Sequence, residues 1–189
     1  NILAQQARFK VAQTSYFKGD FEWAQIQLDV LRKSASQLIA NDAMQLNLMI
    51  RDNTLEDSTQ TALRKYAKAD LMVLQLKNKE GIAAFEEISI QHKGEKIEDE
   101  VLLKLGELYE KTGQYEKAES SYLQLIALYN EDILADDAHF RLAKLYQDKL
   151  QQPAKAKELY EQIIFNFADS IFFIEARKNY RALRGDELN

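Results

Sequence analysis

The sequence predicts an all-α fold, a right-handed superhelix of antiparallel helix pairs closed by a C-terminal capping helix. Six glycines and one proline are few for 189 residues. Because Gly and Pro usually mark strands, turns and loops, their scarcity favours long helices joined by short turns. A pattern of small and aromatic residues also recurs after about 37 residues, and a period of this size is typical of stacked helix pairs.

The clearest copies of this pattern lie between Leu102 and Tyr160. The first copy comprises Leu105, Gly106, Tyr109, Ala118 and Tyr122, and the second Leu142, Ala143, Tyr146, Ala156 and Tyr160. We expect the small residues where the two helices of a pair approach, and the aromatic residues in the grooves between neighbours. One pair cannot cover its own apolar face, so several pairs must stack to form a continuous core.

The N-terminal residues form a weaker copy of the same pair. A first helix is expected over residues 2–17, broken at Gly19, and Asp20 is a suitable N-cap for the second helix. The second helix has an apolar stripe at helical spacing, formed by Phe21, Ala24, Leu28 and Leu31. An aromatic cluster near the turn comprises Tyr16, Phe17, Phe21 and Trp23. Two interpretations of this cluster stay open: core packing, including packing on a preceding repeat, or an exposed patch for a partner.

The middle of the chain departs from the repeat. An apolar helix is expected over residues 39–50, followed by a longer helix from about Glu56 to Lys77. A short helix then places Gly81 in the small-residue position and Phe85 in the aromatic position. We interpret this stretch as a degenerate repeat preceded by a helix outside the repeat.

The last two helices carry clear signals for their ends. Pro153 lies in the first turn of its helix, where its missing N–H costs little. The final helix has an apolar side that includes Ile171 and Ile174, and Gly185 is suited to end it. Its basic residues are expected to form the solvated outer side that a terminal cap needs. These residues are Arg177, Lys178, Arg181 and Arg184.

Together these residues resemble the tetratricopeptide repeat, in which a unit of about 34 residues forms one helix–turn–helix. The resemblance implies a single helical-repeat domain over residues 1–189, a tetratricopeptide-like α-solenoid. Its expected parts are repeat units at about 5–38, 62–93, 99–132 and 136–170, an inserted helical segment at 39–61, and a capping helix at 171–185. The sequence departs from the family pattern at two kinds of position. The large aromatic residue near the start of a unit is replaced by Arg8, Leu102 or His139, and the helix-ending proline by Ser36, Asn130 or Ala168.

A narrower resemblance concerns residues 132–138, 169–177 and 180–186. These segments are similar to tetratricopeptide proteins of bacterial cell envelopes, especially those of the Bacteroidetes type. The resemblance implies that a periplasmic or cell-envelope location is favoured over the cytoplasm, and that the segment 180–186 is a natural C-terminus. The chain starts at Asn1 without an initiator Met, so we expect it to be a piece of a longer protein.

Charge and composition exclude several kinds of partner. The net charge is −5, and the 25 basic residues form no concentrated basic face of the kind that nucleic acids require. No stretch reaches the roughly 18 apolar residues of a membrane span. The absence of cysteine excludes disulfides, thiolate metal sites and cysteine nucleophiles. We therefore expect no nucleic-acid partner, no membrane insertion of this segment and no cofactor.

Catalytic and metal motifs are missing too. The sequence contains no Gly-rich phosphate loop, nucleophile elbow or His-Glu-x-x-His motif. His139 falls where the repeat places a packed aromatic residue, and His92, beside Gly94 in a turn, is expected to be exposed to solvent. We therefore predict no catalytic, cofactor-binding or metal-binding residues, and a protein that is not an enzyme.

The predicted function is a protein–protein interaction scaffold. The resemblance implies that the first helices of each pair line a concave groove that binds a peptide or a partner's helix. The positions expected to face this groove are Leu103, Glu107, Glu110, Phe140, Lys144 and Gln147. Since most of these are acidic, neutral or apolar, recognition of a C-terminal carboxylate by a Lys/Asn clamp is disfavoured. The alternative is a structural spacer or self-assembly segment of a larger envelope protein, in which the array associates with itself.

Overall fold

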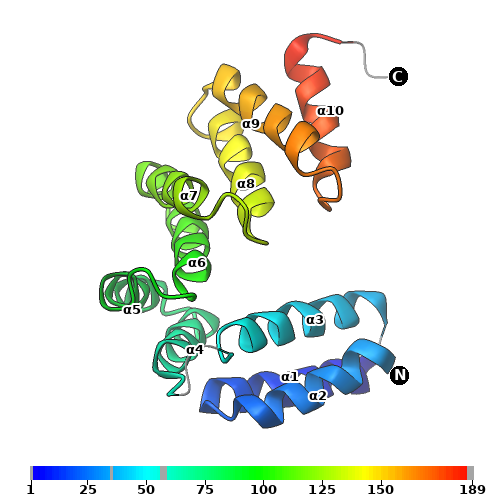
Figure 1. Cartoon of the computed structure of the whole chain (residues 1–189), viewed down its shortest axis with the longest axis vertical. Helices are drawn as coiled ribbons and strands as arrows, with labels where there is room; N and C mark the ends of the chain where they lie inside the picture. Colours follow the sequence, from blue (N-terminus) through cyan, green and yellow to red (C-terminus); the bar gives the residue numbers. More distant parts are fainter. Residues whose placement is uncertain (1, 35, 56–58, 187–189) are drawn as a thin grey trace. The chain divides into compact units, whose positions relative to one another are not determined.

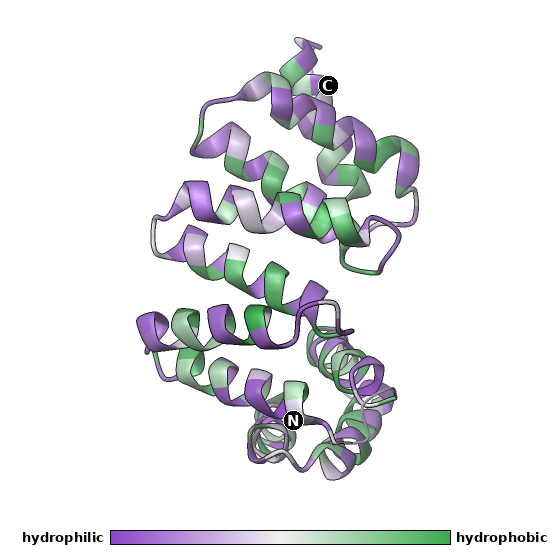
Figure 2. Cartoon of the chain, turned by 60° about the vertical axis from the view of Figure 1, so that its left-hand side comes forward, coloured by the Kyte–Doolittle hydropathy of each residue, from purple (hydrophilic) through white to green (hydrophobic). Residues whose placement is uncertain are grey.

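The computed structural model describes residues 2–34, 36–55 and 59–186. These residues contain ten α-helices and no strand, so the predicted all-α class is confirmed. The chain divides into two compact units, Asn1–Glu98 and Asp99–Asn189, which we call unit 1 and unit 2 and describe separately. Figure 2 shows hydrophobic and hydrophilic residues interleaved along the helices. Within the described part of the chain, no helix is both long and apolar enough to cross a membrane.

Unit 1 consists of five helices (Figure 1). They are α1 (Ile2–Lys18), α2 (Phe21–Ser34), α3 (Gln37–Asp52), α4 (Thr61–Leu74) and α5 (Asn78–Gln91). Consecutive helices pack as α1 on α2, α2 on α3 and α4 on α5, and α1 also contacts α4. The helix α3 is the one expected outside the repeat.

The core of unit 1 contains the residues that the repeat pattern selected in this half of the chain. Ala24 and Leu28 are fully buried on α2. On α5, the buried ring of Phe85 packs edge-on against Tyr66 of α4, with ring centroids 4.9 Å apart. A Cβ at Gly81 would lie 2.7 Å from Val73 Cγ2, so α5 approaches α4 so closely that a larger residue there would displace the Val73 side chain.

Unit 2 contains α6 (Glu98–Lys111), whose first residue is the last of unit 1, followed by four further helices. They are α7 (Tyr115–Tyr129), α8 (Ala135–Asp148), α9 (Pro153–Asn166) and α10 (Phe173–Arg184). The helix α8 packs on α7 and on α9, and α10 packs on α9. The small residues and tyrosines of the two clearest sequence copies lie in this unit, and Tyr122 and Tyr160 are fully buried.

The tightest approach in unit 2 joins α6 to α7 at Gly106. A Cβ at this position would lie 2.6 Å from Cζ and 2.7 Å from Cδ1 of the Tyr122 ring. Real side chains do not reach such distances without displacement of a neighbour. The predicted role of Gly106, which is to let the two helices of a pair approach, is therefore confirmed at atomic detail.

Two of the predicted helix ends are also confirmed. Pro153 occupies the first turn of α9. Gly185 follows α10 with a φ of 89°, a left-handed conformation that favours glycine, and its N–H donates to the carbonyl of Ala182.

Other helix boundaries differ from the prediction. The helix expected from about Glu56 to Lys77 spans Thr61–Leu74 in the structure, because Gln60 and Leu76 on either side have positive φ angles of 53° and 63°. The predicted start at residues 56–58 lies outside the described residues.

The capping helix expected over residues 171–185 is shorter, Phe173–Arg184. Ile171 and Ile174 do not form its buried side, since they are 81% and 82% exposed. Instead, α10 buries Ala176, the small residue that allows close packing on α9.

Candidate partner-binding site

The first helices of the two pairs in unit 2, α6 and α8, carry all six residues predicted to face the groove. Leu103 and Phe140 are largely buried, with 9% and 7% of their surface exposed. The other four are polar side chains that make hydrogen bonds or ion pairs within unit 2, as described below. We call this surface of α6 and α8 the first-helix face.

An ion-pair network connects α6 to α8 across this face. Arg141 Nη2 lies 2.7 Å from Glu107 Oε1, and Arg141 Nε lies 2.6 Å from Asp137 Oδ1. Burial alone would lower the pKa of Arg141, but the charges of Glu107 and Asp137 outweigh it and the pKa is raised. Arg141 therefore stays charged, and Glu107 holds it in place.

Two further predicted positions accept hydrogen bonds from buried tyrosines of the second helices. Tyr122 Oη donates to Glu110 Oε1 at 2.5 Å, and Tyr160 Oη donates to Gln147 Oε1 at 2.9 Å. Burial raises the pKa of Tyr122 far above its ordinary value of 10.0, and the hydrogen bond to Glu110 raises it further. Both tyrosines therefore remain neutral donors, and each fixes one polar residue of the first-helix face.

A pocket of about 230 Å³ opens along α8, beside the end of α6 and the turn before α10. Phe140 forms its floor together with Phe172, on which it stacks with ring centroids 4.5 Å apart and an interplanar angle of 13°. The pocket is lined by Glu110, Asp137, Phe140, Arg141, Lys144, Leu145, Asp148, Lys149 and Phe172. Its rim thus alternates acidic and basic groups around an aromatic floor.

Lys144 has the weakest internal contacts of the pocket's predicted residues. Its ammonium lies 3.8 Å from Asp148 Oδ2 and 3.6 Å from Glu175 Oε1, and all three side chains are about half exposed. It also lies 5.9 Å from the centroid of the Phe140 ring. Long ion pairs between solvent-exposed side chains contribute little to stability. Lys144 can therefore exchange them for contacts with a binding partner at low cost.

The structure therefore brings three predicted residues to one pocket: Glu110, Phe140 and Lys144. Leu103, Glu107 and Gln147 do not line it. Sequence reasoning did not identify Phe172 or Lys149 as part of this pocket. Phe172 lies in the turn before α10, and no periodic signal places a turn residue over the end of another helix.

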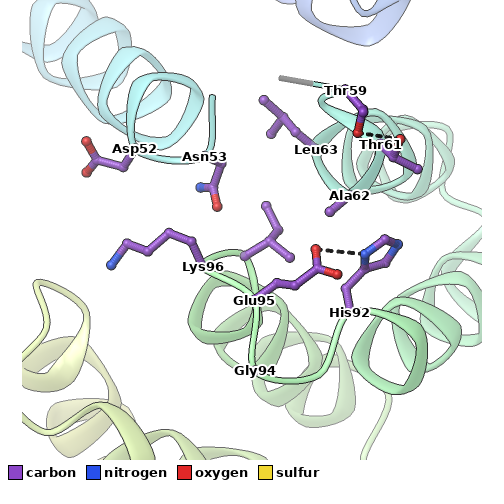
Figure 3. A pocket seen from close by; sticks show the side chains of 11 residues that line it. Asp52, Asn53, Thr59, Thr61, Ala62, Leu63, His92, Gly94, Glu95 and Lys96 are labelled. Carbon is purple, nitrogen blue, oxygen red and sulfur yellow. Dashed lines mark hydrogen bonds and ion pairs between the residues drawn. The ribbon is translucent and has the colours of Figure 1, made fainter. Parts of the chain in front are cut away.

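Unit 1 contains a second hollow of about 400 Å³ between the end of α3, the start of α4 and the loop after α5 (Figure 3). Asn53 reaches into it from the end of α3, and Lys96, Glu95 and His92 reach into it from the loop. The expectation that His92 is exposed was wrong, because only 11% of its side chain is exposed. Its Nδ1 lies 2.9 Å from Glu95 Oε2, and its Nε2 lies 3.2 Å from Lys65 Nζ, so the loop closes over the ring.

His139 occupies the packed aromatic position that its repeat assigns to it. The residue is 5% exposed, its Nδ1 lies 2.8 Å from the carbonyl oxygen of Ala135, and its ring centroid lies 5.2 Å from that of Phe167. Burial lowers the pKa of His139, against the smaller effect of its backbone hydrogen bond. Among the described residues, no three His, Asp or Glu side chains are grouped so that they could hold a metal ion.

The comparisons with known proteins concern the part of the chain that contains this site. Residues 101–132 and 137–170 each match a family model described as tetratricopeptide repeat. Each of these two stretches is therefore similar to a tetratricopeptide repeat. They cover α6 to α9 and all six predicted groove residues, and repeats of this kind generally mediate protein–protein interactions on a scaffold that is typically non-catalytic. No curated protein sequence matches the chain.

Solved structures extend the fold assignment to the whole chain. The chain is similar to the crystal structure of nearly identical TPR-like repeats named as a kinesin light chain of Podosopora anserina. The TM-score is 0.55 at 16% sequence identity, over 98% of this chain and 89% of that one. A point variant of the same repeats gives a TM-score of 0.53 at 17% identity, over 95% and 92% of the two chains. At this identity the likeness shows the fold, a tetratricopeptide-like α-solenoid.

Proposed function

We propose that this protein is a non-catalytic scaffold that binds a peptide or a partner's helix across the first-helix face of α6 and α8. The observation that carries the proposal is the pocket beside Phe140. Its aromatic floor can bury an apolar side chain of the partner, and its charged rim can orient the partner's polar groups. A buried apolar anchor inside a polar rim is the usual anatomy of a protein interface.

The rim also has groups that are free to change partners. Lys149 has no ion-pair partner among the described residues, and its ammonium lies 6.0 Å from the centroid of the Tyr115 ring. Lys144 has only the two long pairs described above. By contrast, the Glu107–Arg141–Asp137 network is short and serves to hold α6 and α8 together. We therefore place partner recognition at the two lysines and the phenylalanine floor.

Photo-crosslinking in the source cells tests this proposal. A photoreactive amino acid at Asp148, which lines the pocket together with Lys144 and Lys149, should form a discrete adduct with a partner, whereas the same group at Glu158, exposed on the second helix α9, should not. In the chain that carries this group at Asp148, Lys144→Glu together with Lys149→Glu should abolish the adduct and leave the helix content and thermal unfolding unchanged. Equal adducts at Asp148 and Glu158 would contradict the proposal.

The alternative function, self-assembly, has an observation of its own. Trp23, Ile26 and Val30 lie along α2 at i, i+3 and i+7, and their side chains are 55%, 50% and 54% exposed. An apolar stripe of this kind is suited to packing on another helix. Sedimentation of the wild type and of Trp23→Ser at rising concentration distinguishes the two functions. Self-assembly predicts a mass that rises with concentration in the wild type and stays constant in the variant.

The bacterial cell-envelope location of the Bacteroidetes type remains a proposal, supported by the resemblance of residues 132–138 and 169–177 to such proteins. Fractionation of source cells with an antibody against the chain tests it. Recovery with cytoplasmic markers alone would overturn this location and leave the binding proposal untouched.

A further inference from the structure

The exposed side of α10 contains a hollow that the repeat pattern does not explain. It has a volume of about 500 Å³ and is lined by Ile164, Arg177, Tyr180, Arg181, Arg184 and Asp186. The three arginines come from one helix at i, i+4 and i+7, so they point to the same side. Among the described residues that line the hollow, one carboxylate, Asp186, faces these arginines, in a chain whose net charge is −5. We call this site the arginine hollow.

The internal contacts of the hollow show how it holds a carboxylate. Both oxygens of Asp186 accept from Arg184 Nε, at 2.9 and 3.1 Å, and Arg184 Nη2 also donates to Oδ2. Arg181 Nε lies 3.6 Å from the same Oδ2. Paired donors on a planar guanidinium match the two oxygens of a carboxylate, which is the strongest and most directional form of this contact.

The positions of these groups are fixed by contacts outside the ion pairs. Gly185 turns the chain at the end of α10, and the N–H of Asp186 donates to the carbonyl of Arg181 at 3.0 Å. The guanidinium carbon of Arg184 lies 5.6 Å from the centroid of the Tyr180 ring. Tyr180 is itself held by a hydrogen bond of 2.9 Å from its hydroxyl to Glu161 Oε1 on α9.

Within the described part of the chain, the pairing of Asp186 leaves one arginine of the hollow, Arg177, out. Each guanidinium has five N–H donors, and Asp186 engages Arg184 closely and lies 3.6 Å from Arg181 Nε. Arg177 has no ion-pair partner among the described residues. Its side chain is exposed on the same side of the helix, one turn before Arg181.

We propose that the arginine hollow binds an acidic segment of a protein partner, whose carboxylates engage Arg177 and compete with Asp186 for Arg181 and Arg184. Ile164 and Tyr180 supply an apolar wall against which the methylene groups of the partner's acidic side chains can pack. A peptide fits better than an anionic membrane surface, because a peptide can enter a hollow whereas a flat surface would also meet the carboxylate of Glu161, which accepts from Tyr180 beside the hollow. This site is separate from the first-helix face and does not depend on the function proposed for it.

Fluorescence anisotropy with a labelled hexaglutamate peptide, blocked at both ends, tests the proposal on the whole chain. Hexaglutamate should bind at low salt and hexaglutamine should not. Arg177→Gln and Arg181→Gln should each weaken binding about tenfold, the loss of one charge-assisted contact. Lys178→Gln is the matched control, because it removes the same charge from an exposed position of α10 that does not line the hollow.

Asp186→Asn provides a second, independent measurement. Removal of the competing carboxylate should tighten hexaglutamate binding more than Glu158→Gln does, because Glu158→Gln removes the same charge from an exposed position of α9 that does not line the hollow. Helix content and thermal unfolding of each variant should match the wild type, since all these side chains lie at the surface.

Two kinds of result would overturn the proposal. The first is no hexaglutamate binding at low salt, or equal weakening by Lys178→Gln and Arg177→Gln. The second is binding of inorganic phosphate, or of vesicles that contain phosphatidylserine, by a chain that does not bind hexaglutamate. Lys144→Glu with Lys149→Glu on the first-helix face should leave hexaglutamate binding in place, so failure of one site is distinguishable from failure of the other.

Discussion

Units 1 and 2 pack their helix pairs by the same rule but secure the packing differently. In both, a glycine on one helix lets a neighbouring helix approach, with Val73 opposite Gly81 in unit 1 and Tyr122 opposite Gly106 in unit 2. In unit 2, the buried ring also carries a hydroxyl that donates to Glu110 of the first helix. The buried ring on α5 of unit 1 is Phe85, which has no hydroxyl. Small and aromatic residues are therefore enough to pair the helices, while tyrosine adds a directional contact that also positions a surface carboxylate.

The variants with the largest expected effect on stability remove the buried ring of each unit. Tyr122→Ala and Phe85→Ala both empty a fully buried site, so each should lower the free energy of unfolding by about 3–5 kcal/mol. Tyr122→Ala should be the more damaging, because it also deletes the hydrogen bond to Glu110. Urea unfolding of the full chain measures both. A larger loss for Phe85→Ala would show that the hydroxyl adds nothing to unit 2.

The next test adds a methyl group at each glycine. Gly106→Ala drives a Cβ into a buried ring and should destabilise the chain by about 1–3 kcal/mol, despite the better helix propensity of alanine. Gly81→Ala brings the new Cβ within 3.0 Å of one atom, a Val73 methyl group, whereas at Gly106 it meets three atoms of the Tyr122 ring, so the effect at Gly81 should be smaller. Thermal unfolding of both variants checks the order. A Gly106→Ala protein as stable as the wild type would contradict the tight approach of α6 to α7.

Sequence reasoning succeeded at the glycines and the buried rings because the size and spacing of the residues alone determine where two helices can approach. Period and size place Gly106 where the two helices of a pair approach, whatever the details of the turn, and the structure adds that the Tyr122 ring is the group opposite it. The partner of the Tyr122 hydroxyl was not predictable, because it depends on how far a side chain of α6 reaches across the pair. Phe172 over Phe140 and the exposure of Ile171 and Ile174 were missed for a related reason. Each depends on where the turn before α10 ends, and turn geometry has no periodic signal in the sequence.

A smaller and more specific test removes only the Tyr122 hydroxyl. Tyr122→Phe keeps the ring and should cost about 1–2 kcal/mol near neutral pH, typical of a buried hydrogen bond to a charged acceptor. Tyr180→Phe is the control, since its hydroxyl bonds to Glu161 at the surface, and its effect should be smaller. Urea unfolding at neutral pH measures both, and equal losses in the two variants would show that burial adds nothing to the Tyr122 contact.

The same variant has a consequence at alkaline pH. The pKa of Tyr122 is raised in the folded state by burial and by Glu110, above the 10.0 of an unfolded chain. Its contribution to stability is therefore complete below pH 10 and is lost as the pH rises beyond it. Tyr122→Phe should show a shallower alkaline loss than the wild type. The loss should not vanish, because burial raises the pKa of Tyr146 and Tyr160 too. An identical alkaline slope in the two proteins would contradict the hydrogen bond.

The smallest expected effect concerns His139, which fills an aromatic position of unit 2 with a titratable ring. Burial lowers its pKa in the folded state below the ordinary 6.5, so the unfolded chain binds a proton more readily than the folded one. The contribution of His139 to the free energy of unfolding is therefore complete above about pH 6.5 and declines as the pH falls below that value. His139→Phe should flatten the dependence of the unfolding midpoint on pH between neutral and mildly acidic conditions. Titration of the His139 ring by NMR gives the matching direct measurement, and a pKa at or above 6.5 would mean that the ring is not held in the core as the packing against Phe167 requires.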